Sequence, residues 1–333
     1  MSYQQEYQRW LRSGALSQAE KGRVGGHRPR AQEIEDRFFG LLEFGTAGLR
    51  GVMGVGLRRM NVHVIRHATQ AFAQVILEEG PEAAAQGVAI CYDCRVHSQE
   101  FAQAAAGVMA ANGIPVRLFQ AMRPTPELSF AVREYGCIAG LNVTASHNPP
   151  EYNGYKVYWE DGAQITAPRD REIIAEVNAI TDFSQVRTMG LREAEEAGLF
   201  QHLGEEMDSR YIEELKKLVL NPEVVREQGK DMRIVYTPLH GTGNLPVRRI
   251  LKELGFEKVW VVPEQELPDG DFPTVSYPNP EDKNAFALAL KLAKEVDADI
   301  VLATDPDATA WESMEKTNKQ ENICHLLATC QGC

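Results

Sequence analysis

A serine, a histidine and an asparagine follow one another at positions 146 to 148, directly after an apolar stretch at 138–143. A serine hydroxyl is a weak nucleophile unless a neighbouring group activates it. Pro149 and Pro150 come next, and proline neither continues a strand ladder nor extends a regular helix. The pattern predicts that Ser146 lies on a stiff turn at the end of a strand, beside the titratable ring of His147.

Three other segments carry residues that suit charged ligands. Arg50 stands between glycines, which allow close backbone approach, and its guanidinium can grip a phosphate with two hydrogen bonds. Asp305 and Asp307 follow an apolar strand and offer the hard oxygen ligands that Mg²⁺ prefers. His240 and Gly241 lie between a strand and a helix, where backbone N–H groups can meet an anion. Taken singly, each segment also has an ordinary structural explanation. The segment around Arg50 is typical of a turn, the two aspartates are typical of solvated surface charge, and His240 is typical of a structural histidine.

Apolar periodicity predicts alternating strands and helices around these segments. In the first part of the chain we expect strands at 88–92, 115–119, 138–143 and 155–159, and helices at 62–79, 98–113, 125–136 and 169–180. Asn61 is the expected N-cap of the helix at 62–79, and Thr125, followed by proline, is expected to cap the helix that it precedes. This alternation predicts an α/β domain with a partly parallel sheet over residues 1–203.

A second cycle of strands and helices begins after residue 204. Strands are expected at 232–236, 258–262 and 300–303, and helices at 205–220, 245–254 and 284–296. We assign this second α/β domain to residues 204–310. Ligands of such sheets bind at the carboxyl ends of the strands, and both Ser146 and Asp305 follow a strand directly. The sequence therefore predicts that these two residues share one site.

Composition limits the classes of function. The chain has 333 residues, 44% of them hydrophobic and 25% charged, which is typical of a soluble globular protein of about two domains. The formal charge of −12 argues against nucleic acid or an anionic membrane as a partner, although local basic groups can still bind a small anion. The polar N-terminus lacks the apolar core of a signal peptide, and no segment approaches a transmembrane helix in length. We expect a cytoplasmic protein with a small-molecule partner.

In order and context, the four segments resemble those of the α-D-phosphohexomutase family, which comprises phosphoglucomutases and phosphomannomutases. The likeness runs from about Glu33 to Asp307, and the motif at 236–243 is similar to the branch that includes phosphopentomutases. The resemblance implies two consecutive three-layer α/β/α domains with mixed, mainly parallel sheets. It also implies an intramolecular phosphotransferase that interconverts sugar 1-phosphates and sugar 6-phosphates.

The resemblance further implies catalytic roles. Ser146 would carry a phosphoryl group, donate it to a sugar monophosphate and regain a phosphoryl group from the resulting bisphosphate intermediate. Lys156 would be the general acid/base, and Arg50 and His147 would stabilise charge and steer protons around the phosphoserine. A sugar bisphosphate, glucose 1,6-bisphosphate, would serve as the primer.

The implied ligands are a metal ion and phosphate groups. Mg²⁺ would be bound by Ser146, Asp305 and Asp307, with the ion on the serine phosphate. The expected substrate- and phosphate-binding residues are Thr46, Gly48, Arg50, Asn148, His240 and Gly241.

The chain departs from the family pattern after Ala308. The family's metal loop reads D-P-D-x-D-R, whereas Thr309 stands at the third acidic position here and Ala310 at the arginine. Deleting one base from a coding of the expected Ala-Asp-Arg-Leu-Gly-Ile yields Ala-Thr-Ala-Trp-Glu-Ser, the sequence at 308–313. We hypothesise a frameshift after Ala308, a disordered tail over 311–333 and the absence of the family's third and fourth domains, with little or no mutase turnover. Resequencing the gene at this codon tests the hypothesis.

Other interpretations stay open at this stage. Within the family, the sugar could be a pentose phosphate or a mannose phosphate. A protein of a different class would be a non-catalytic fragment that only binds sugar phosphates. A serine hydrolase built on Ser146 is the weakest alternative, because the sequence around Ser146 lacks the G-x-S-x-G nucleophile elbow. The oligomeric state is not indicated by the sequence.

Overall fold

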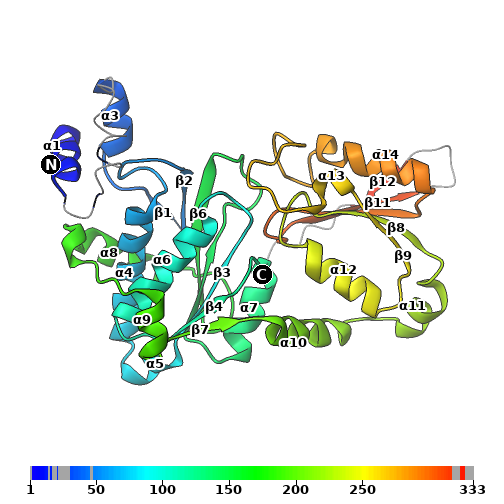
Figure 1. Cartoon of the computed structure of the whole chain (residues 1–333), viewed down its shortest axis with the longest axis horizontal. Helices are drawn as coiled ribbons and strands as arrows, with labels where there is room; N and C mark the ends of the chain where they lie inside the picture. Colours follow the sequence, from blue (N-terminus) through cyan, green and yellow to red (C-terminus); the bar gives the residue numbers. More distant parts are fainter. Residues whose placement is uncertain are drawn as a thin grey trace.

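The computed structural model describes residues 2–13, 16, 21, 31–45, 48–316 and 323–326. The strands of this part of the chain form two sheets, one of seven strands and one of five. Figure 1 shows the sheets as two lobes, with α10 (Glu205–Lys216) between them and in contact with helices of both. The predicted pair of α/β domains is confirmed. Among the described helices, none combines the length and the apolar character that crossing a bilayer requires.

The first sheet is mixed and has a parallel core. Its strands, in spatial order, are β1 (Phe44–Gly45), β2 (Gly48–Val52), β6 (Tyr152–Trp159), β5 (Ala139–Val143), β3 (Val88–Tyr92), β4 (Val116–Phe119) and β7 (Phe200–Leu203). The strands from β5 to β7 run parallel, and β6 and β2 run antiparallel to their neighbours. β5 is buried along its whole length. It therefore holds the Ser146 loop at a fixed place, at the carboxyl end of the parallel strands.

Helices cover both faces of the first sheet. On one face lie α4 (Val62–Glu78), α6 (Ser98–Ala111), α8 (Arg169–Ala179) and α9 (Leu191–Glu196), and on the other lies α7 (Thr125–Glu134). Side chains alternate across a strand, and β3 shows the consequence. Ile90 packs into the core beneath α4 and α6, whereas Ala89 and Cys91 pack beneath α7. This alternation produces the predicted three-layer arrangement.

Shorter elements surround this domain. They are α1 (Tyr3–Arg12), α3 (Ala31–Phe38), α5 (Pro81–Gln86) and the short helix η1 (Phe183–Gln185). In Figure 1, α1 and α3 lie at the outer end of the first lobe, far from the junction between the lobes.

The second sheet is also mixed. Its strands, in spatial order, are β12 (Ile323–Leu326), β11 (Trp311–Lys316), β10 (Ile300–Thr304), β8 (Arg233–Thr237) and β9 (Lys258–Val261). The strands β10, β8 and β9 run parallel, while β11 and β12 run antiparallel to their neighbours. α14 (Ala287–Val296) packs against β8 and β10, and α12 (Asn244–Glu253) contacts α10. The remaining helices are α11 (Pro222–Gln228), α13 (Pro263–Glu266) and η2 (Lys283–Phe286).

The segment after residue 310 differs from the expectation. β11 pairs with β10 through residues 311–315, and Met314 lies in the core of the second domain with 3% exposure. The edge of a strand offers unpaired N–H and C=O groups. β11 pairs with the edge of β10 that would otherwise be open. β12 pairs with β11 in turn, so the prediction of disorder is wrong for residues 311–316 and 323–326. Residues 317–322 and 327–333 lie outside the described part of the chain.

The two predicted helix caps have different outcomes. The Asn61 side chain accepts hydrogen bonds from the backbone N–H groups of His63 and Val64, so its predicted capping role is confirmed. The cap predicted at Thr125 is wrong, because Pro124 is the N-cap and Thr125 is the first residue of α7. The Thr125 hydroxyl instead contacts the second domain, as described below.

We predict that Asn61→Ala lowers the free energy of unfolding of the first domain by about 2 kcal/mol. The substitution removes the cap of α4 and also three bonds from Nδ2 to the carbonyls of Gly54, Gly56 and Arg59. Urea titration followed by tryptophan fluorescence measures the loss. Asn61→Asp keeps the capping oxygen and loses the amide donor. We expect its free energy of unfolding to lie between those of the parent protein and Asn61→Ala. An alanine variant as stable as the parent would contradict the assignment.

Candidate active site

The Ser146 loop is held in an unusual backbone conformation. Ser146 has φ 51°, in the left-handed region that non-glycine residues rarely adopt. Its N–H donates to Thr144 Oγ1 at 2.9 Å, and the N–H of Asn148 donates to the carbonyl of Ala145 at 3.0 Å. These bonds hold the turn, and the turn directs the Ser146 hydroxyl toward the second domain. A left-handed serine costs about 1 kcal/mol, so the surrounding contacts must impose it.

Arg95 supplies most of those contacts. Its buried guanidinium donates to the carbonyls of Ser146 at 2.7 Å, Pro149 at 2.8 Å and Tyr152 at 3.1 Å, and also to that of Asn148. The Asp93 carboxylate lies 3.3 Å from Arg95 Nε and balances the charge. One cation from the end of β3 thus fixes the loop that follows β5.

The Ser146 hydroxyl meets the second domain at Asp305. Ser146 Oγ donates to Asp305 Oδ2 at 2.6 Å, and the N–H of Ala310 donates to Oδ1 at 2.9 Å. His147 Nδ1 lies 3.4 Å from Ser146 Oγ and 3.8 Å from Asp305 Oδ2. Burial and the neighbouring charge of Asp307 raise the pKa of Asp305 to about 6. The predicted pairing of the two strand ends is present in the structure.

Asp307 lies beside this pair and is also fully buried. Lys156 Nζ donates to Asp307 Oδ2 at 2.8 Å, and Thr309 Oγ1 donates to Oδ1 at 2.8 Å. Burial by itself raises the pKa of a carboxyl group, but the Lys156 ammonium and the hydrogen bonds outweigh it and hold the pKa of Asp307 well below its ordinary value. Thr309 Oγ1 also lies 3.4 Å from Ser146 Oγ. The hydroxyl at the third position of the loop therefore reaches both the serine and an aspartate.

The glycine-rich segment approaches the same loop from β2. Arg50 Nη1 donates to Asn148 Oδ1 at 3.1 Å, which brings two of the predicted phosphate-binding residues together. Gly48 has φ 83°, and a Cβ there would lie 2.0 Å from the carbonyl oxygen of Tyr155. Position 48 thus requires glycine, because β2 and β6 approach each other too closely there for a side chain. Thr46, another predicted phosphate-binding residue, lies outside the described residues.

His240 and Gly241, both predicted to bind phosphate, lie in a closely packed part of the second domain. His240 Nδ1 lies 3.1 Å from the carbonyl oxygen of Leu267 and Nε2 lies 2.9 Å from Thr274 Oγ1, so both ring nitrogens are engaged within the second domain. A Cβ at Gly241 would lie 2.5 Å from Pro306 Cα. Gly241 thus packs against the backbone of the Asp305 loop. Phosphate binding by His240 and Gly241 stays a prediction.

Sequence reasoning missed two residues that hold the site. Arg95 follows β3 by three positions, and Thr125 donates through Oγ1 to Asp307 Oδ2 at 3.0 Å. The signal for Arg95 was a cation directly after a buried strand next to the serine strand. The sequence carries no separate signal for the contact of Thr125 with Asp307, because a threonine followed by proline is also typical of a helix start.

The oxygen atoms at the junction suit a hard divalent cation. Among the residues that the structure describes, no group of three or more histidine, cysteine, aspartate or glutamate side chains is placed to hold a metal. Ser146, Asp305, Asp307 and Thr309 nevertheless bring two carboxylates and two hydroxyls together. Burial and, after it, the neighbouring charge of Asp307 raise the pKa of Asp305, and a bound cation would offset both effects. The donor set therefore fits Mg²⁺, with a neutral ligand where a third carboxylate was expected.

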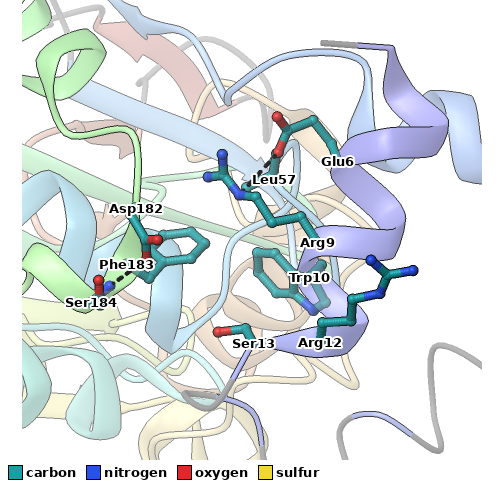
Figure 2. A pocket seen from close by; sticks show the side chains of 9 residues that line it. All are labelled: Glu6, Arg9, Trp10, Arg12, Ser13, Leu57, Asp182, Phe183 and Ser184. Atoms are coloured by element: carbon teal, nitrogen blue, oxygen red, sulfur yellow. Dashed lines mark hydrogen bonds and ion pairs between the residues drawn. The ribbon is translucent and has the colours of Figure 1, made fainter.

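A separate cavity of about 460 Å³ lies in the first domain, between α1 and η1. In Figure 2, Arg9 and Trp10 from α1 face Phe183 and Asp182. Its lining includes none of the predicted site residues. The predicted chemistry therefore belongs to the junction between the domains and not to this cavity.

Comparisons with known proteins agree with the fold and with the order of these segments. Residues 41–183 match the family model described as phosphoglucomutase/phosphomannomutase, alpha/beta/alpha domain I. Residues 209–312 match the model for domain II of the same family. The second match ends within β11.

Curated relatives are similar along most of the chain. Phosphopentomutase of Mus musculus is 36% identical over 324 residues, which cover 95% of this chain and 51% of that protein. Phosphoglucomutase of Staphylococcus saprophyticus is 37% identical over 285 residues, covering 86% and 50% respectively. Glucose 1,6-bisphosphate synthase of Homo sapiens is 36% identical over 312 residues, covering 90% and 48%. The chain spans about half the length of these curated relatives.

Solved structures share the fold of this chain. A protein of Thermus thermophilus superposes with a TM-score of 0.69 at 27% identity, over 83% of this chain and 57% of that one. A phosphoglucomutase/phosphomannomutase family protein of Burkholderia thailandensis has a TM-score of 0.61 at 22% identity, covering 84% and 55%, and shares the fold. With both family domains matched in order and relatives above one-third identity along nearly its whole length, this chain belongs to the phosphoglucomutase/phosphomannomutase family, the α-D-phosphohexomutases.

Proposed function

We propose that this chain carries the phosphoryl-transfer site of a phosphosugar mutase, with Ser146 as the phosphoryl carrier. The observation that supports it is the 2.6 Å bond from Ser146 Oγ to Asp305, which joins the two domains at one hydroxyl. In the transfer, a bond forms between phosphorus and Ser146 Oγ while the bond between phosphorus and the sugar oxygen breaks. The reverse step returns the phosphoryl group to another oxygen of the sugar.

The neighbouring residues supply what phosphoryl transfer needs, which is positioning and positive charge. Lys156 lies in the same cluster through its 2.8 Å bond to Asp307, and we assign it the role of general acid/base for the sugar hydroxyl. Arg50 Nη1 lies 3.1 Å from Asn148 Oδ1, beside Ser146. We propose these two residues as the phosphate ligands of the first domain. His147, 3.4 Å from Ser146 Oγ, is placed to stabilise charge on the transferring group.

The proposed metal is Mg²⁺, held by Ser146 and its phosphoryl oxygens together with Asp305 and Asp307. When bound, Mg²⁺ neutralises charge that develops on the phosphoryl oxygens. The Thr309 hydroxyl, 2.8 Å from Asp307 Oδ1, contributes orientation without a negative charge. The described ligands therefore carry two carboxylates, and we expect weaker Mg²⁺ binding than three carboxylates would give.

The substrates that we propose are hexose or pentose monophosphates, with a sugar bisphosphate as the primer. Relatives at similar identity are named phosphopentomutase, phosphoglucomutase, phosphoribomutase and glucose 1,6-bisphosphate synthase. These proteins share phosphorylated sugars and differ in the sugar. We therefore propose the phosphoryl chemistry for the described residues and leave the choice between hexose and pentose to assay.

The geometry does not favour a serine hydrolase. In a hydrolytic triad, the histidine lies between the serine and an acid that orients the ring. Here Asp305 accepts the serine hydroxyl directly at 2.6 Å, while His147 Nδ1 is 3.4 Å from the same hydroxyl. The ring of His147 packs edge-on against Tyr277, with centroids 5.5 Å apart. An acid that accepts from the serine itself suits a phosphoryl carrier better than an acyl-enzyme.

We predict that Ser146 becomes phosphorylated when the protein is incubated with glucose 1,6-bisphosphate and Mg²⁺. Phosphopeptide mass spectrometry locates the modification, and Ser146→Ala is expected to abolish it. Ser184→Ala, a serine on η1 outside the site, is the matched control and is expected to leave labelling unchanged. Phosphate on another residue, or labelling that survives in Ser146→Ala, would refute the assigned carrier.

We predict that Lys156→Met lowers the rate of Ser146 phosphorylation at least about a hundredfold, because it removes the proton carrier and the nearest ammonium. Methionine keeps the length and apolar stem of the lysine. Lys258→Met, on β9 and outside the site, controls for the loss of a positive charge. Quenched-flow labelling with radioactive bisphosphate measures both rates. Equal rates for Lys156→Met and the parent would exclude Lys156 from the mechanism.

A further inference from the structure

Thr125 holds Asp307 at two points. Its hydroxyl donates to Asp307 Oδ2 at 3.0 Å, and its backbone N–H donates to the carbonyl oxygen of Asp307 at 2.9 Å. Thr125 belongs to the first domain and Asp307 to the loop of the second, and both are buried, with 1% and 0% exposure. A single residue therefore fixes both the backbone and the side chain of a proposed metal ligand from across the domain junction.

The proton positions in this contact are determined by chemistry. An ionised carboxylate can only accept hydrogen bonds, so the Thr125 hydroxyl must use its one proton on Asp307. Asn142 Nδ2, 2.6 Å from Thr125 Oγ1, must then be a donor to the same hydroxyl. The bonds form a directed chain from Asn142 through Thr125 to Asp307. Each of the three side chains is buried, so a missing member would leave a buried group unpaired.

The same face of the first sheet supplies the second donor to Asp307. Asn142 on β5 lies directly opposite Lys156 on β6 in the strand register. Directly opposite residues project to the same face of a sheet. Lys156 Nζ reaches Asp307 Oδ2 directly, whereas Asn142 reaches it through Thr125. The register of β5 and β6 therefore sets the geometry of both bonds to one carboxylate oxygen.

The backbone around Thr125 is itself anchored. Arg123, two residues earlier, forms a bidentate ion pair with Asp208 of α10, with distances of 2.8 and 2.7 Å. Because α10 lies between the lobes (Figure 1), this pair ties the start of α7 to the helix that links the domains. The contact with Asp307 is thus made from a rigid element.

We infer that Thr125 is a positioning residue that orients the Asp307 carboxylate, with Oδ2 toward Lys156 and Oδ1 toward Thr309. This inference rests on the proposed function, since it gives Lys156 and Asp307 their chemical roles. Without the Thr125 hydroxyl, the Asp307 side chain is held from the first domain by Lys156 alone, while Thr309 holds Oδ1 from within the same loop. The loop at 305–310 then loses its side-chain attachment to α7 and keeps the backbone bond.

The experiment compares Thr125→Val, which replaces the hydroxyl by a methyl of similar size, with Thr125→Ser, which keeps the hydroxyl. Thr69→Val is the matched control, because Thr69 is also a buried hydroxyl of the first domain but contacts Ile65 and Tyr155. The first readout is hydrogen–deuterium exchange of the peptide at 304–312. The second is the rate of Ser146 phosphorylation as a function of glucose 1,6-bisphosphate concentration.

We expect Thr125→Val to speed exchange at 304–312 at least tenfold and to lower the maximal phosphorylation rate at least tenfold, with little change in the half-saturating concentration. Thr125→Ser is expected to restore both values, and Thr69→Val to change neither. Parent-like exchange in Thr125→Val, or a serine variant as impaired as the valine variant, would overturn the inference. A parent protein that takes no phosphate on Ser146 would refute the proposed function instead, and the exchange readout would still decide whether Thr125 holds the loop.

Discussion

Two carboxylates are completely buried where the two domains meet, and the rest of the site is arranged to satisfy them. Removing an ionised carboxylate from water costs several kcal/mol, of the order of 5, unless donors replace the water. The second domain supplies the N–H of Ala310 and the hydroxyl of Thr309 from the same loop. The first domain supplies the remaining donors, which are Ser146, Lys156 and Thr125. The hydrogen bonds that satisfy these carboxylates across the domain junction are therefore also the bonds on which the proposed chemistry depends.

This arrangement also explains why the serine loop has to be stiff. If Ser146 could relax from its left-handed conformation, its hydroxyl would leave Asp305, and a buried carboxylate oxygen would lose a donor. Arg95 opposes this by donating hydrogen bonds to the carbonyls of the loop. Its guanidinium also lies over the Phe272 ring of the second domain, 5.0 Å from the centroid. Arg95 thus shapes the loop and contacts the opposite domain at the same time.

The sequence was informative wherever function follows from the position along a strand, and less so where it depends on contacts between domains. Strand ends and helix periods predicted both domains and the meeting of Ser146 with Asp305, because each residue follows the carboxyl end of a strand, where sheets of this kind bind their ligands. The two strands, β5 and β10, belong to different sheets, which meet at these ends. Thr125 was misassigned because a threonine before proline has the same local signature whether it caps a helix or bonds to a residue 182 positions away. The partners of His240 could not be predicted for a related reason, since only the packed structure shows that Leu267 and Thr274 contact its two ring nitrogens. β11 was missed because its pairing partner, and not its own composition, makes it a strand.

Thr309 shows how a single uncharged side chain shifts the electrostatic balance of such a site. Burial and the repulsion from Asp307 already raise the pKa of Asp305 to about 6, even with Lys156 paired to Asp307. A third buried carboxylate at position 309 would add to this repulsion and would depend more strongly on a bound cation. The threonine avoids that cost, because its hydroxyl donates to Asp307 and still lies within 3.4 Å of Ser146. The two buried carboxylates therefore receive hydrogen bonds from the protein itself. A divalent cation at this site would meet one negative charge fewer than at a site with a third carboxylate at position 309.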